Sequence, residues 1–183
     1  MTGLAISQLK AVRLIKLDQF EQAEGILTRV AANRRKTFGS SAGLAVDLFH
    51  LGRTKLALGK YREAQTILAE AHPMAAKYLS PSSVPALVTG MTLIEAQAQA
   101  GNLGGAKRTL LQIEPLIQAI PKPGLLQAIF ARANGILLLK EGKVAQASVE
   151  VDRSEKLFRE QGSAGDPYLK AFPMLRAELA KAG

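Results

Sequence analysis

The stretch Gly59-Lys60-Tyr61-Arg62-Glu63-Ala64 decides the fold of this chain, because near copies of it recur at an almost constant interval. The copies are Asp18-Gln19-Phe20-Glu21-Gln22-Ala23, Gly101-Asn102-Leu103-Gly104-Gly105-Ala106 and Gly142-Lys143-Val144-Ala145-Gln146-Ala147. Their starts lie 41, 42 and 41 residues apart. A period of this size is typical of stacked helical repeats, in which each unit buries its apolar face against the next.

The residues after each copy are apolar at helical spacing. In the second copy they are Tyr61, Ala64, Leu68 and Ala71, which are three, four and three residues apart and therefore share one face of a helix. The segments before the copies also read as helices, at about residues 4–17, 43–58, 84–100 and 125–141. Each unit is thus predicted to be a helix–turn–helix, with Gly59, Gly101 and Gly142 at the corner, where positive φ is needed. Asp18 takes this place in the first unit.

Linkers rich in Gly, Ser and Pro separate the units and set their boundaries. We expect repeats at about 4–41, 42–83, 84–124 and 125–165, followed by a capping helix at 166–182 that covers the last repeat. Pro73 and Pro115 fall late in the second helices and should kink or end them. The predicted fold class is all-α: an α-α superhelix, or right-handed solenoid, of about four repeats plus the cap, forming a single repeat domain over residues 1–183.

The pattern resembles the tetratricopeptide repeat. The second unit carries the resemblance through Leu48, Leu51-Gly52, Gly59-Lys60-Tyr61, Ala64, Leu68 and Ala71. The fourth unit keeps Gly135, Gly142 and Ala147. The third departs from the family at Ile94, where a small residue is preferred, so its first helix is expected to pack differently. The first unit keeps Ala11 and lacks the turn glycine.

The period distinguishes varieties of this family. The common repeat has about 34 residues, whereas 41–42 residues resembles the longer variety of kinesin light chains and of many bacterial signalling proteins. Armadillo or HEAT-type repeats have similar periods and stay open as an alternative. The Gly-x-aromatic turn followed by Ala three residues later favours the tetratricopeptide assignment.

The composition limits the class of protein further. The 183 residues contain no cysteine, which excludes disulfides and thiolate zinc sites, and the net charge is +9. Neither a secretory leader pattern nor an apolar run long enough for a membrane span is visible, so a cytoplasmic location is expected. The positive charge could serve nucleic acid or acidic proteins. Nucleic acid is not favoured, because stacking aromatics and a recognition helix are missing.

The search for catalytic chemistry gives little. The letters Gly39-Ser40-Ser41-Ala42-Gly43 match a nucleophile elbow, but that elbow needs a preceding strand, and none is predicted. His50 and His72 lie on different predicted helices without metal-ligand spacing. We therefore expect no enzyme activity, no cofactor and no metal.

The family resemblance implies a binding surface on the first helices, which line the concave face of the superhelix. Counting from each turn gives the expected partner-binding groove. It consists of Gln8, Val12, Lys16, Phe49, Arg53, Met91, Glu95, Arg132, Ile136 and Lys140. Its basic members could pair with acidic side chains or a terminal carboxylate, and Phe49, Met91 and Ile136 are expected to be exposed apolar positions.

The leading functional hypothesis is a non-catalytic protein-interaction scaffold that binds a peptide or partner protein in the concave groove. An acidic partner and simple solvation of the basic groove residues both stay open. The alternative is a sensor or regulatory module of a larger bacterial signalling protein, such as a transcription regulator or a Ser/Thr kinase. A homodimer through an end repeat also stays open, because the N-terminal helix carries Leu4, Ile6, Leu9, Val12 and Leu14 without a preceding cap.

Overall fold

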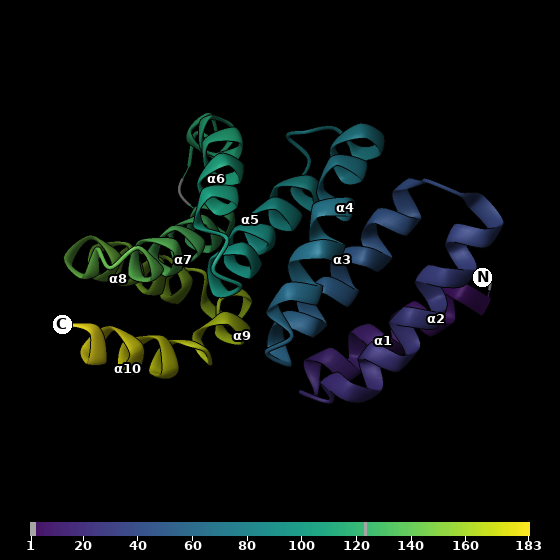
Figure 1. The fold of residues 1–183 in the computed structure, drawn as a ribbon, viewed down its shortest axis with the longest axis horizontal. Coiled ribbons are helices and arrows are strands. Elements are labelled where there is room, and N and C mark those ends of the chain that lie inside the picture. The colour runs from purple at the N-terminus through teal and green to yellow at the C-terminus, as the bar shows by residue number, and fades with distance from the viewer. Residues whose placement is uncertain (1–2, 123) are drawn as a thin grey trace. The chain divides into compact units, whose positions relative to one another are not determined.

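The computed structural model describes residues 3–122 and 124–183, in which the chain forms helices joined by short connections (Figure 1). Met1, Thr2 and Pro123, the last within the linker predicted before the fourth repeat, lie outside the described residues. The chain divides into two compact units, with unit 1 ending at Thr89 and unit 2 beginning at Gly90. Each unit is described separately below.

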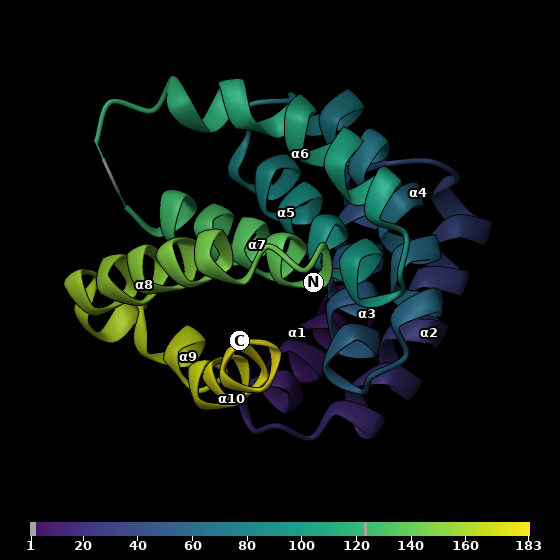
Figure 2. The ribbon, with the colours of Figure 1, turned by 60° about the vertical axis from the view of Figure 1, so that its left-hand side comes forward.

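The helices follow the predicted repeats closely. They are α1 (Gly3–Lys16), α2 (Phe20–Phe38), α3 (Ala42–Ala57), α4 (Tyr61–Leu79), α5 (Val84–Gln99), α6 (Leu103–Gln118), α7 (Leu125–Lys140), α8 (Val144–Glu160), α9 (Asp166–Leu169) and α10 (Phe172–Ala182). In unit 1, α1 lies beside α2 and α3 beside α4, and α2 packs against α3 (Figure 1). In unit 2, α7 and α8 lie side by side (Figure 2).

The four predicted corners have the same backbone geometry. Asp18, Gly59, Gly101 and Gly142 all have positive φ, between 58° and 82°. At the second corner, Gly59 donates its N–H to the carbonyl of Leu56 at 3.1 Å, and Lys60 donates to Lys55 at 2.9 Å. The same two bonds recur at the other three corners. This is the Schellman arrangement, which satisfies the last carbonyls of the first helix before the second begins. The helix–turn–helix prediction is therefore confirmed at each repeat.

Small residues bring the two helices of a repeat together. Ala23, Ala64, Ala106 and Ala147 are completely buried at the equivalent position of the second helix. On the first helix, a Cβ at Gly52 would lie 2.5 Å from Cγ of Leu68, and a Cβ at Gly135 would lie 2.9 Å from Cγ2 of Val151. The third repeat has Ile94 at this position, and Leu110, the counterpart of Leu68, is only partly buried. The departure expected at Ile94 thus coincides with looser burial of its partner.

Replacing Gly52 by Ala is expected to destabilise the protein by about 1–3 kcal/mol, because the added methyl group overpacks Leu68. This cost opposes the gain in helix propensity of about 1 kcal/mol. Gly25→Ala is the matched control, since nothing lies within 4 Å of a Cβ at this position of α2, and it should stabilise. Urea unfolding midpoints measure both. Equal increases in the two midpoints would show that the space beside Gly52 is not filled.

Pro73 and Pro115 were predicted to kink or end their helices, and the C-terminal segment was predicted to form one helix. Pro73 and Pro115 lie inside α4 and α6, and both helices continue past them, so neither residue ends its helix. The capping segment predicted as one helix over 166–182 is divided into α9 and α10, and the prediction of a single helix is wrong. The segment packs on the last repeat: the Tyr168 ring stacks on Phe158 with centroids 4.8 Å apart, and Phe172 meets Phe158 edge-on at 6.0 Å.

Candidate functional site

An apolar pocket in unit 1 is the candidate binding site. Its volume is ≈ 230 Å³, below the roughly 300–1,000 Å³ typical of small-molecule sites. Its walls are formed by residues of α3, of the end of α4 and of the first turns of α5. They are lined by Ala45, Val46, Phe49, His50, Ala75, Val84, Pro85, Val88 and Thr89. A pocket of this size and polarity suits one or two apolar side chains of a protein ligand better than a cofactor.

Local hydrogen bonds fix the start of α5, which forms one wall. Ser83 precedes the helix, and its hydroxyl donates to the carbonyl of Ser80 at 2.7 Å and accepts from the N–H of Ala86 at 3.4 Å. His72 on α4 places Nδ1 3.2 Å from the carbonyl oxygen of Ala86, an arrangement that requires a proton on Nδ1. Burial lowers the pKa of His72. Ala45, Ala75 and Ala86 form the buried cluster beneath this wall.

His50 contributes a neutral ring to the pocket. Burial, together with the nearby charge of Arg53, lowers its pKa to about 4. Nδ1 is buried and has no hydrogen-bond partner among the described residues. The ring leans against Phe49, with centroids 5.1 Å apart. His50 is therefore uncharged at neutral pH and adds to the apolar character of the wall, while Arg53 brings a positive charge close to it.

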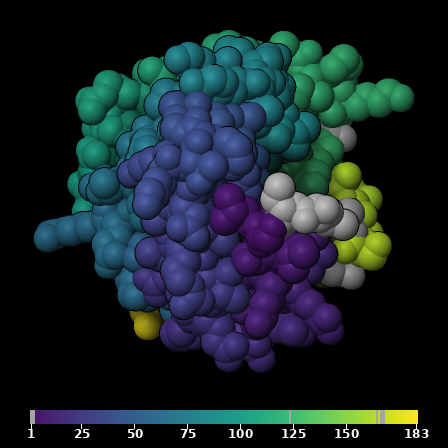
Figure 3. Space-filling model, turned by 90° about the vertical axis from the view of Figure 1, so that its right-hand side faces the viewer, coloured from purple at the N-terminus to yellow at the C-terminus, as the bar shows by residue number. Residues whose placement is uncertain are grey.

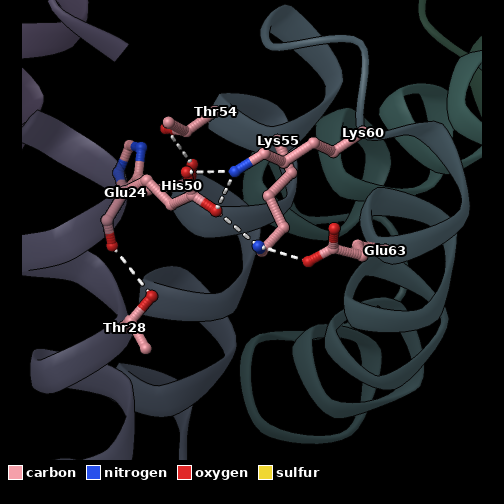
Figure 4. A network of polar contacts seen from close by, with 7 residues as sticks. All are labelled: Glu24, Thr28, His50, Thr54, Lys55, Lys60 and Glu63. Carbon is pink, nitrogen blue, oxygen red and sulfur yellow. Dashed lines mark hydrogen bonds and ion pairs between the residues drawn. The ribbon is translucent and has the colours of Figure 1, made fainter. Parts of the chain in front are cut away.

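The buried ammonium group of Lys55 links α3 to the neighbouring helices, a short way along α3 from the pocket residue His50 (Figure 4). Nζ of Lys55 donates to Glu24 on α2 and to Glu63 on α4, both at 2.6 Å, and Lys60 also donates to Glu24, at 2.7 Å. The bonds from Lys55 and Lys60 lower the pKa of Glu24. Burial alone would lower the pKa of Lys55, but its two carboxylate partners outweigh burial and raise it. The network joins three helices and thereby positions the face of α3 that lines the pocket.

The predicted groove residues of unit 1 lie on the first helices, as counted from the turns. Gln8 and Val12 are partly buried on α1, and Lys16 is exposed at its end. Phe49 and Arg53 are partly buried on α3. Of this set, only Phe49 lines the pocket.

The predicted groove residues of unit 2 are mostly withdrawn from solvent. Met91 is completely buried and Ile136 is 8% exposed, so the expectation that they are exposed apolar positions is wrong. Glu95 is buried and accepts two hydrogen bonds from Arg132, at 3.0 and 2.9 Å. Nζ of Lys140 lies 3.1 Å from Glu178 of α10. The charges of Arg132 and Lys140 are thus matched within the unit.

Sequence reasoning missed most of the pocket. Val46 and Val88 precede Phe49 and Met91 by three residues, so extending the counted face by one turn would have found both. Val84 and Pro85 carry no such signal, because their place depends on how the start of α5 meets α4.

Ser41, which lies within the letters of the nucleophile elbow, has a structural role. Ser41 is the N-cap of α3, and its hydroxyl accepts from the N–H of Leu44 at 3.3 Å.

Across the described residues, no three His, Asp or Glu side chains are grouped closely enough to bind a metal ion. Within the same ranges, none of the helices combines the length and the apolar character that crossing a membrane requires.

The comparisons with known proteins agree with this architecture. Residues 4–77 match the family model described as tetratricopeptide repeat. Two crystal structures, one of them of a single-substitution variant, are similar over 98% of this chain and 84% of theirs, with 22% sequence identity and a TM-score of 0.65. They show nearly identical TPR-like repeats of a Podosopora anserina protein assigned as a kinesin light chain. No curated protein sequence matches significantly. The fold class is therefore the all-α superhelical repeat class, as predicted.

Proposed function

We propose, from the match of residues 4–77 to the tetratricopeptide-repeat model, that the chain is a non-catalytic interaction scaffold of this repeat family, and that its unit 1 binds a peptide or a segment of a partner protein. Tetratricopeptide repeats generally mediate interactions between proteins. The observation that carries the proposal is the apolar pocket in unit 1 that residues of α3, α4 and the start of α5 line.

The ligand is a segment with an apolar anchor residue and a neighbouring acidic group. The anchor enters the pocket that Phe49 and Val88 line, because burying an apolar side chain in a desolvated apolar pocket contributes favourable binding free energy. The acidic group lies toward Arg53, whose charge already acts on His50. Gln8, Val12 and Lys16 continue the proposed groove along α1. Met91 and Ile136 of unit 2 are buried and are not part of the proposed site.

Val88→Glu is expected to weaken peptide binding by roughly 30-fold or more, the loss typical of an interface hot spot, because it places a charge in the pocket wall. The probes are peptides selected from a displayed random library against the wild-type protein, and their affinities are measured by fluorescence anisotropy. Val149→Glu, at an exposed valine of α8, is the matched control and should leave affinity unchanged.

Two further readouts make the test decisive. Circular dichroism melts confirm that Val88→Glu remains folded. The selected peptides should share an apolar residue next to an acidic one. Peptides that bind wild type and Val88→Glu equally well would contradict the proposed pocket, and selection of peptides without an apolar anchor would contradict its chemistry.

A further inference from the structure

Helix α1 exposes a continuous stripe that combines apolar and basic side chains. We define the α1 stripe as Ile6, Leu9, Lys10, Arg13, Lys16 and Leu17, all of which are exposed. Ile6, Leu9 and Leu17 are 58–59% exposed, which is unusual for large apolar residues that share one helix face. Figure 3 shows α1, in purple, at the surface of the molecule.

The same face is covered in the later repeats. The counterparts of Ile6, Lys10 and Arg13 in α3, found by adding the repeat interval of 41, are Asp47, Leu51 and Thr54, and all three are buried. The next counterparts in α5 are Thr89, Leu93 and Ala96, which are also buried. At these three positions α1 is exposed, whereas α3 and α5 are buried; the counterpart of Lys16 in α3, Ala57, is exposed as well.

The covering element at α3 is the second helix of the preceding repeat. Leu51 belongs to the same buried cluster as Ala23 and Leu27 of α2. Asp47 pairs with Arg34 near the end of α2. A helix that packed on α1 as α2 packs on α3 would therefore cover the α1 stripe.

The charge of the stripe specifies the chemistry of that helix. Lys10, Arg13 and Lys16 have no ion-pair partner within the described residues, and α1 contains no acidic side chain. Pairing two copies of α1 would bring two sets of cations together, which disfavours a second copy of this chain as the occupant. We propose that the α1 stripe is a docking surface for an acidic amphipathic helix of a partner protein. This surface shares no residue with the pocket of the proposed function, and it shares only Lys16 with the groove proposed along α1.

A peptide derived from α2 tests both the geometry and the charge. The probe carries residues 20–38 with Arg29→Glu, Arg34→Glu, Arg35→Glu and Lys36→Glu, and the control peptide has the unchanged sequence. Binding to the full chain is measured by fluorescence anisotropy. We expect the acidic probe to bind about tenfold or more tightly than the control, with an affinity that falls as salt rises.

Variants of the stripe complete the test. Ile6→Ser with Leu9→Ser should weaken the acidic probe about tenfold or more, and Arg13→Glu should shift preference toward the control peptide. Val88→Glu should leave probe binding unchanged, which separates this surface from the pocket. Equal binding of the two peptides, failure of the acidic probe to bind, or insensitivity to the Ile6 and Leu9 changes would overturn the proposal. So would dimerisation, seen by sedimentation, that the Ile6 and Leu9 changes abolish.

Discussion

Arg34→Ala is expected to destabilise unit 1 by about 3–5 kcal/mol, because it leaves a buried carboxylate without its counter-charge. Asp47 is completely buried and accepts a hydrogen bond from Nε of Arg34, while its Oδ1 has no partner among the described residues. Burial raises the pKa of Asp47, and the Arg34 guanidinium opposes that rise. Without Arg34, Asp47 must either remain charged in an apolar setting or take up a proton, and both cost stability.

The neighbouring arginine provides the control for this prediction. Arg35 pairs with Glu70 at 2.8 Å, but both side chains are about half exposed, so Arg35→Ala should cost no more than about 1 kcal/mol. The double variant Arg34→Met/Asp47→Leu should recover most of the loss, since it removes both charges. Urea unfolding at neutral pH measures the three variants. If Arg34→Ala and Arg35→Ala prove equally mild, Asp47 is not held by Arg34 as described.

Arg132→Ala is expected to have a comparable effect on unit 2, again about 3–5 kcal/mol. Two of its guanidinium nitrogens donate to one oxygen of buried Glu95, and the guanidinium carbon lies 5.7 Å from the centre of the Tyr168 ring. The residue therefore joins α5, α7 and the segment after α8. Its loss should lower the urea midpoint and weaken the attachment of the C-terminal segment.

Lys140→Ala is the control on the same helix. Lys140 and Glu178 are both about one-third exposed, so removing this pair should change stability by no more than about 1 kcal/mol. The combination Arg132→Met/Glu95→Leu should restore most of the stability that Arg132→Ala loses. A loss of less than about 1 kcal/mol from Arg132→Ala would contradict the stabilising role assigned to its pairing with Glu95.

The two largest effects thus fall on residues whose role depends on burial. Arg132 was expected to be part of a basic groove, yet its charge is matched by Glu95. Reversing its charge would place two carboxylates together in a buried site, and any loss of binding would then follow from loss of structure. Variants in the unit 1 pocket and on the α1 stripe change solvent-facing or partly buried positions, and therefore report on binding more directly.

The sequence alone determined the repeat and its corners. Each unit needs positive φ at its corner and a small residue at the position of Ala64. Because these requirements are local and every unit must meet them, the same residue types recur in the sequence at the repeat interval. The limits of the helices on either side of each corner follow from that pattern.

Only the tertiary structure decided which positions on the first helices are accessible and which charges are free. Met91 and Phe49 occupy equivalent positions, but one is completely buried and the other lines a pocket. Glu95 and Arg132 are 37 residues apart and become partners only when α5 and α7 pack together. Burial and ion pairing depend on contacts between repeats, and a periodic sequence fixes the position of a residue on its helix without fixing what lies opposite it.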